Sequence, residues 1–255
     1  MQDGYTGDIG DFGKYGLLRA LAGAGDDSAL RLGVVWYLTP DQPQLGDGGF
    51  LDYLLPEAED EYRPCDPELF ASLRALVMSG ARSVAGVRIR EILPPGTIYY
   101  ESLLAYAGAA RGRRLAMREQ WLDQALIATA PADIVFLDPD NGLRTRPLEG
   151  KPEELKSVHL DELRPYLARG QSCVVYHHLG RTRTHDVEMS DWRETLQEGL
   201  GLDTPPFALR FARRSPRVFF VIPAAAHRTE LAARLGRFLD GPWGRLFPPN
   251  EALGL

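Results

Sequence analysis

The segment Asp133-Ile134-Val135-Phe136-Leu137-Asp138-Pro139-Asp140-Asn141-Gly142 joins a continuous apolar run to an abrupt polar turn. A run of this kind is typical of a strand that is buried on both faces of a parallel sheet. Residues 32–38 and 172–176 have the same character, and patterns of helical spacing lie between the runs. This alternation predicts an α/β fold with a mostly parallel sheet and helices on both of its faces.

The remaining elements follow from spacing and from turn residues. Helices are predicted at residues 11–22 and at about 67–79, 82–93, 111–129, 159–168 and 225–239, and a short strand at 97–100. Residues 207–211 and 217–222 are strand-like, and the five residues between them have the spacing of a hairpin. The sheet is therefore predicted to end in a C-terminal antiparallel hairpin.

Length and composition limit the classes of protein that the chain can belong to. The 255 residues are 44% hydrophobic and 25% charged, which is average for a globular protein and predicts one domain over residues 1–255. No apolar run approaches the roughly 18 residues of a membrane-spanning helix, and residues 1–20 lack the pattern of a signal peptide. These features predict a cytoplasmic protein without a membrane partner. A net charge of −6 argues against nonspecific coating of nucleic acid but leaves a local basic patch open.

Polar side chains follow each of the three buried runs. They are Thr39 and Asp41 after the first run, Asp138, Asp140 and Asn141 after the second, and His177, His178 and Arg181 after the third. In open α/β sheets, ligands bind in the crevice beyond the carboxyl ends of the strands. The three sets are therefore predicted to line one cleft, with the acidic turn in its middle.

The turn Asp138-Pro139-Asp140-Asn141-Gly142 is the strongest local indication of chemistry. Pro139 restricts the backbone and Gly142 permits a conformation that other residues resist, so the carboxylates of Asp138 and Asp140 are held in place. Such a pair can bind a divalent cation, Mg²⁺ or Mn²⁺, or it can accept hydrogen bonds from an amino group. The residues alone leave both uses open.

Histidines and arginines supply the other candidate functional groups. His177 and His178 are neighbours on a strand and point to opposite faces, so only one of them is expected to serve the cleft. An imidazole there can act as a general base, and Arg181 or Arg183 can bind a substrate phosphate. Further arginines occur at 111–114 and in the hairpin, and they are either a phosphate-facing surface or scattered, solvated side chains.

Four segments carry a resemblance to known proteins: residues 7–21 (GDIGDFGKYGLLRAL), 33–41 (GVVWYLTPD), 134–143 (IVFLDPDNGL) and 174–181 (VVYHHLGR). They resemble an uncharacterised family of bacterial and phage proteins with the motifs GDxxDxxKYGLL and FxDPDNGL. More distantly, the order of elements resembles the 23S rRNA adenine-N6 methyltransferases of the J type, which use S-adenosylmethionine (SAM). That resemblance implies a Rossmann-like, SAM-methyltransferase-type sheet.

The resemblance also implies roles for particular residues. Lys14 would grip the SAM carboxylate, and the acid and backbone carbonyl of Asp138-Pro139 would receive the amino group to be methylated. The sequence departs from that family at Asp140 and Asn141, which replace a Pro and a stacking Tyr, and it lacks a glycine-rich turn directly after the first strand. The candidate cofactor-binding residues are Asp11, Lys14, Trp36, Thr39, Asp41, Gly46 and Gly48; the candidate catalytic residues are Asp138, Pro139, Asp140, Asn141 and His178.

Three functions are compatible with these features. The first is a SAM-dependent methyltransferase-like enzyme that acts on nucleic acid or a nucleotide-like substrate. The second is a Mg²⁺- or Mn²⁺-dependent phosphoesterase or nuclease, in which Asp138 and Asp140 hold the metal and His178 activates water. The third is a non-catalytic partner protein that keeps a methyltransferase scaffold.

Overall fold

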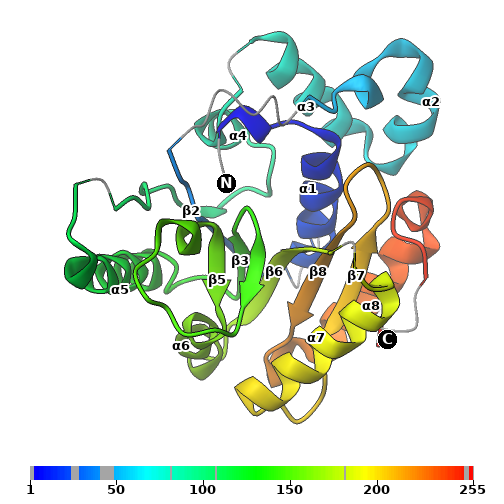
Figure 1. Cartoon of the computed structure of the whole chain (residues 1–255). Helices are drawn as coiled ribbons and strands as arrows, with labels where there is room; N and C mark the ends of the chain where they lie inside the picture. Colours follow the sequence, from blue (N-terminus) through cyan, green and yellow to red (C-terminus); the bar gives the residue numbers. More distant parts are fainter. Residues whose placement is uncertain are drawn as a thin grey trace.

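A six-stranded sheet with the order β2-β1-β3-β6-β8-β7 forms the centre of the molecule (Figure 1). The computed structural model describes residues 3–23, 29–40, 49–80, 82–106, 108–180, 182–249 and 253–254. Strands β1, β2, β3 and β6 run parallel, whereas β8 is antiparallel to both of its neighbours. This is the predicted α/β architecture, Rossmann-like and mostly parallel. The strands of the sheet are β1 (Leu32–Trp36), β2 (Ile98–Tyr100), β3 (Ile134–Asp138), β6 (Ser172–His178), β7 (Phe207–Phe211) and β8 (Arg217–Ile222).

Helices cover both faces of this sheet, as predicted (Figure 1). One face packs against α1 (Ile9–Ala22), α3 (Pro67–Met78), α4 (Val84–Ile89) and α8 (Arg228–Asp240). The other face packs against α5 (Arg111–Ala128), α6 (Arg164–Ala168) and α7 (His185–Leu200). A short helix α2 (Glu59–Tyr62) precedes α3.

Alternate residues of each strand enter opposite layers of the core, because successive side chains of a strand point to opposite faces. Val34 and Phe136 lie in the layer under α1, whereas Val35 and Val135 lie in the layer under α5. The same alternation decides where the last residue of each strand points. Asp138 follows Phe136 by two positions and therefore faces α1.

A second sheet of two parallel strands, β4 (Gly142–Arg144) and β5 (Ser157–His159), was not predicted. Strand β4 begins directly after the acidic turn and lies beside β6, so the turn is held between the two sheets. Three residues give too little periodicity to be recognised as a strand from sequence. Helix α7 was also not predicted, although Gly201 ends it in the left-handed conformation typical of a helix C-terminus.

Several predicted helix bounds were wrong. The helix predicted at 82–93 ends at Ile89, since Glu91 adopts a positive φ of 50° and two prolines follow. The helix predicted at 159–168 is divided into a 3₁₀ turn, Leu160–Leu163, and α6. None of the helices in the described ranges has the length and apolar character needed to cross a membrane.

Candidate functional site

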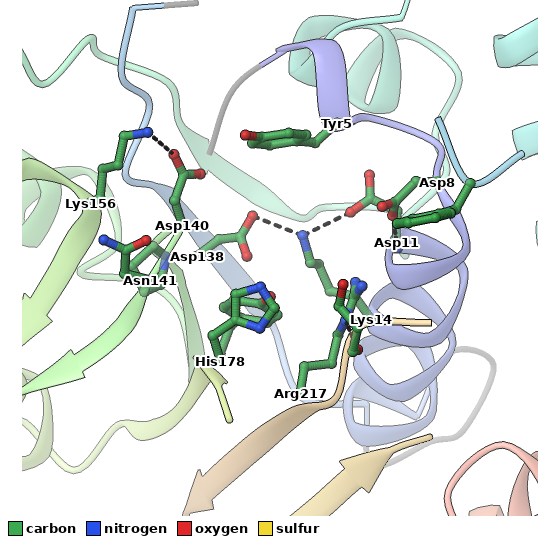
Figure 2. Close-up of a pocket in the computed structure, with 14 residues that line it drawn as sticks. Tyr5, Asp8, Asp11, Lys14, Asp138, Asp140, Asn141, Lys156, His178 and Arg217 are labelled. Carbon is green, nitrogen blue, oxygen red and sulfur yellow. Dashed lines mark hydrogen bonds and ion pairs between the residues drawn. The ribbon is translucent and has the colours of Figure 1, made fainter. Parts of the chain in front are cut away.

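A cavity of about 280 Å³ opens at the carboxyl edge of the sheet, beside the start of α1 (Figure 2). Its walls come from the first turn of α1, the acidic turn after β3, the end of β6 and the hairpin before β8. Segments around Tyr5, Phe50 and Lys156 complete the lining. The full set is Tyr5, Asp8, Asp11, Lys14, Phe50, Asp138, Pro139, Asp140, Asn141, Lys156, Tyr176, His178, Ser215 and Arg217.

Helix α1 begins at this cavity because Asp8 caps it. The Asp8 Oδ1 atom accepts a hydrogen bond from the Asp11 amide at 2.9 Å, which satisfies one of the free amides of the first turn. The Asp11 carboxylate accepts hydrogen bonds from the Gly7 amide and the Tyr15 hydroxyl, each at 2.9 Å. These contacts fix both carboxylates at the N-terminal end of the helix.

Lys14 bridges α1 and the acidic turn. Its Nζ atom lies 2.8 Å from Asp11 Oδ1 and 2.9 Å from Asp138 Oδ2, and Figure 2 shows it between the two carboxylates. The rings of Trp36 and Tyr176 lie 5.7 Å and 5.9 Å from the ammonium group, which is an arrangement for cation–π attraction. Only 4% of Lys14 is exposed. The two carboxylates raise the pKa of Lys14 even though burial opposes its charge, so the side chain is a permanent cation.

The acidic turn is stiff for the reasons that its sequence predicts. Gly142 has a φ of 103°, and a Cβ atom there would lie 2.5 Å from His177 Nδ1, so no other residue fits. The Asn141 amide donates to the Lys156 carbonyl at 2.7 Å. Lys156 in turn lies 3.7 Å from Asp140 Oδ2. The two carboxylates of the turn therefore face different lysines.

Burial raises the pKa of two carboxyl groups in the cavity. Asp138 is 2% exposed, and its pKa is raised by desolvation although the Lys14 charge acts in the opposite direction. The pKa of Asp8 is raised by desolvation and by the nearby Asp11 charge, and it is lowered in part by Arg217. A cationic or hydrogen-donating ligand group in this cavity would offset the cost of these buried charges.

The two histidines of β6 lie on opposite faces of the sheet. His178 lines the cavity, together with Tyr176 two positions earlier. His177 is buried on the α7 side, where its Nδ1 atom accepts a hydrogen bond from the Leu143 amide at 3.0 Å and its ring packs against Trp192. Burial lowers the pKa of His177 to about 4, and the nearby His178 adds to this effect. His177 is therefore a neutral packing residue at physiological pH.

All of the residues that the sequence singles out as catalytic come together in this cavity. Asp138, Pro139, Asp140, Asn141 and His178 all line it, and so do Asp11 and Lys14 from the predicted cofactor set. Trp36 and Thr39 are buried and do not line it. Arg183 is exposed and pairs with Asp191. Asp41, Gly46, Gly48 and Arg181 lie outside the described residues.

Other lining residues were not expected. Tyr5, Phe50, Lys156 and Ser215 come from segments without a distinctive pattern, so only the folded chain places them at the cavity. Arg217 was noted as one of the hairpin arginines, and its position at the start of β8 brings it into the lining. The arginines at 111–114 lie elsewhere, and Arg111 pairs with Glu149.

A metal site gains no support from these contacts. Within the described ranges, no three His, Cys, Asp or Glu side chains are grouped in a way that could hold a metal ion. Asp138 is engaged by Lys14, and Asp140 lies toward Lys156 (Figure 2).

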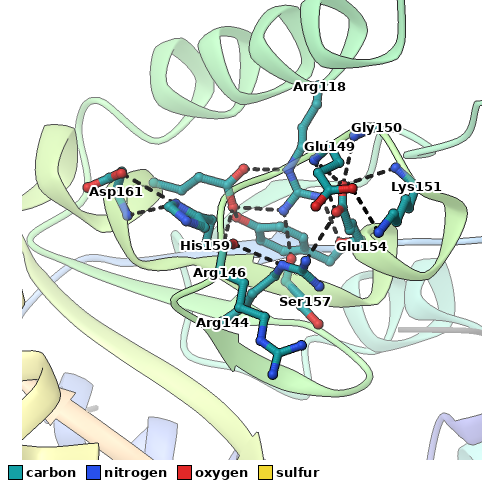
Figure 3. A network of polar contacts seen from close by, with 12 residues as sticks. Arg118, Arg144, Arg146, Glu149, Gly150, Lys151, Glu154, Ser157, His159 and Asp161 are labelled. Carbon is teal, nitrogen blue, oxygen red and sulfur yellow. Dashed lines mark hydrogen bonds and ion pairs between the residues drawn. The ribbon is translucent and has the colours of Figure 1, made fainter. Parts of the chain in front are cut away.

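A second buried charged cluster lies in the layer under α5, around Arg118 (Figure 3). The guanidinium group forms two hydrogen bonds to Glu162, at 2.6 and 2.8 Å, and donates to the carbonyls of Glu154 and Ser157. The Glu154 carboxylate accepts hydrogen bonds from the backbone amides of residues 149–151. This network ties the segment between β4 and β5 to α5. The acidic turn contacts the same segment, because the Asn141 amide donates to the Lys156 carbonyl.

Comparisons with models of known protein families and with curated protein sequences find no match to this chain.

Proposed function

We propose that the protein is a SAM-dependent methyltransferase-like enzyme that acts on nucleic acid or on a nucleotide-like substrate. The arrangement of the sheet supports this proposal. A mostly parallel sheet that closes with an antiparallel hairpin and a final helix is the arrangement methyltransferases use, and here β8 is inserted between β6 and β7. Because a fold alone does not fix a function, the argument depends on the cavity at the carboxyl edge of this sheet.

The single observation that carries the proposal is the position of Asp138. Its carboxylate ends β3 at the cavity and is held by Lys14 at 2.9 Å, so it is aligned before any ligand binds. A carboxylate in this position can accept a hydrogen bond from an amino group and so orient the lone pair of its nitrogen. Pro139 follows in the lining and keeps the turn from moving away from the cavity.

The lining fits a ligand with charged and aromatic parts. Both signs of charge are present, in Asp8 and Asp138 on one hand and Lys156 and Arg217 on the other, and the ring of Tyr5 lies over the same space (Figure 2). SAM supplies an electrophilic methyl group when it is bound. The residues of this chain would bind the charged ends of cofactor and substrate, orient the acceptor nitrogen and exclude water.

A nucleotide-like substrate is proposed because aromatic and basic groups border the cavity together. Phe50 lies in the lining, and the Arg214 guanidinium lies 5.3 Å from the centre of its ring. Aromatic rings and arginine planes are the usual partners of a base that is outside a duplex. Lys156, which lies 3.7 Å from Asp140 Oδ2, is a cation of the lining that can contact a phosphate.

Calorimetric titration with SAM and with S-adenosylhomocysteine tests the proposal. The protein is expected to bind both, and Asp138→Ala is expected to abolish transfer of a labelled methyl group to RNA, DNA or nucleotides. Asp161→Asn is the matched control, since Asp161 is an exposed carboxylate paired with Arg164, outside the cavity. Absence of heat with both ligands at high concentration would remove the proposal.

A further inference from the structure

Arg217 is a buried cation whose terminal nitrogens have no hydrogen-bond partner among the described residues. It is 7% exposed, its Nε atom donates to the Ser215 carbonyl at 3.2 Å, and its terminal nitrogens donate to no residue in the described part of the chain. The rings of Tyr176 and Phe211 lie about equally far from the guanidinium, at 6.0 and 5.9 Å. Because Arg217 lines the cavity, these nitrogens can donate hydrogen bonds to a ligand there.

Gly10, in the first turn of α1, leaves the space that this guanidinium group occupies. A Cβ atom on Gly10 would lie 1.3 Å from Arg217 Nη1, so only glycine allows the arginine to reach this place. The guanidinium group thus packs against the first turn of α1. Arginine groups held in one geometry lose little entropy when they bind a carboxylate or phosphate.

Asp8 is the complementary group. It is 8% exposed, and only its Oδ1 atom has a hydrogen bond among the described residues, the capping bond from Asp11. The Arg217 charge lowers the pKa of Asp8, so the two groups are within electrostatic reach. No ion pair joins them in the described chain, and both line the cavity. A buried cation and a buried anion therefore stand close together without neutralising each other by direct contact.

Lys14, the expected partner of a ligand carboxylate, is already engaged. Its ammonium group has both carboxylates of Asp11 and Asp138 within hydrogen-bond distance and is 4% exposed. A ligand carboxylate at this point would displace or crowd Asp138. An anionic ligand group in the cavity therefore needs another cation, and the terminal nitrogens of Arg217 donate to no residue in the described ranges.

We infer that Arg217 and Asp8 form a receptor for a zwitterionic α-amino-acid group, in which Arg217 binds the carboxylate and Asp8 accepts the ammonium. A simple anion fits less well, because Asp8, Asp11 and Asp138 line the same cavity and would repel it. A zwitterion satisfies both groups at once. The inference deepens the proposed function and rests on it for the identity of the ligand, which is then the methionine end of SAM.

Ligand comparison on the unaltered protein tests the receptor without any risk of misfolding. S-adenosylhomocysteine carries the amino-acid group, and 5′-methylthioadenosine keeps the adenosine and thioether but lacks that group. Calorimetry is expected to show at least about 10-fold weaker binding of 5′-methylthioadenosine, the loss that corresponds to one charge-assisted hydrogen bond. L-methionine is expected to bind weakly and its methyl ester, which lacks the carboxylate, not at all.

Variants then assign the effect to Arg217 and to the neighbouring Gly10. Arg217→Gln and Gly10→Ala are each expected to weaken S-adenosylhomocysteine about 10- to 100-fold and to leave 5′-methylthioadenosine unchanged. Gly10→Ala is informative because it displaces the guanidinium without removing its charge. Arg213→Gln is the matched control, since this hairpin arginine pairs with Glu61 and does not line the cavity.

The outcomes separate the receptor from the methyltransferase proposal. If L-methionine binds and requires Arg217 while the adenosyl ligands do not bind, the receptor stands and the methyltransferase proposal fails. If S-adenosylhomocysteine and 5′-methylthioadenosine bind equally and Arg217→Gln changes neither, the receptor is overturned and the cofactor proposal survives. If no compound with an α-amino-acid group binds, both are overturned.

Discussion

Two buried charged clusters, one around Arg118 and one around Lys14, differ in what their polar groups contact. Around Arg118, the guanidinium group has a carboxylate and two backbone carbonyls as partners, and Figure 3 shows these polar contacts. Around Lys14, the carboxylates border a cavity that is also lined by Arg217, whose terminal nitrogens donate to none of the described residues. A satisfied network stabilises a unique fold, whereas a partly satisfied network at a cavity indicates a binding site.

The largest expected effect on stability comes from breaking the cluster around Arg118. Arg118→Met would leave the Glu162 carboxylate buried without its cation, which typically costs about 3–5 kcal/mol in the free energy of unfolding. Urea denaturation at pH 7 measures this loss. Arg111→Gln, at an exposed arginine of the same helix, is the control, and a loss for Arg118→Met no larger than for Arg111→Gln would contradict the comparison.

The pH dependence of stability tests the packing role of His177. Its pKa in the folded protein is lowered from 6.5 to about 4, so the unfolded chain binds more protons between these values. The contribution of His177 is therefore complete above pH 6.5 and is lost as the pH falls toward 4, by about 3 kcal/mol in all. The difference in unfolding free energy between the unaltered protein and His177→Gln should shrink across this window; a constant difference would show that His177 does not titrate as proposed.

Removal of Lys14, the cation of the other cluster, is expected to lower the free energy of unfolding by less. Lys14→Met removes the cation that Asp11 and Asp138 share, but water in the cavity can hydrogen-bond to Asp138, so we expect a loss of about 1–3 kcal/mol at pH 7. Without Lys14 the folded-state pKa of Asp138 rises further, so the loss should be smaller at pH 5 than at pH 7. Thermal unfolding at both pH values measures this, and a loss as large as that of Arg118→Met would erase the distinction between the clusters.

The smallest effect on stability is expected at Asp8. Asn caps a helix about as well as Asp, so Asp8→Asn preserves the start of α1 while it removes a buried charge. Because the pKa of Asp8 is raised in the folded state, its charge costs stability at neutral pH, and the variant should be more stable by up to about 1 kcal/mol. Urea denaturation at pH 7 measures the gain, and a clear loss would show that the carboxylate is needed for the fold.

Much of the candidate site could be predicted because strand periodicity is visible in the sequence. The apolar runs place Asp138 and His178 at the carboxyl edge, and alternation puts His177 and His178 on opposite faces, as in the structure. The hairpin strands were predicted with their observed bounds, 207–211 and 217–222. Helix α7 was missed because only Met189 and Leu196 of its residues are buried, which leaves a weak apolar pattern.

The sequence by itself determined the α/β class, the buried strands and the stiff acidic turn, because these depend on local periodicity and on the backbone limits of proline and glycine. Only the tertiary structure decided that Lys14 pairs with Asp138 across 124 positions of chain and that Arg217 rests on Gly10. Such contacts depend on strand order and register, which bring distant segments together and leave no mark in the spacing of either one.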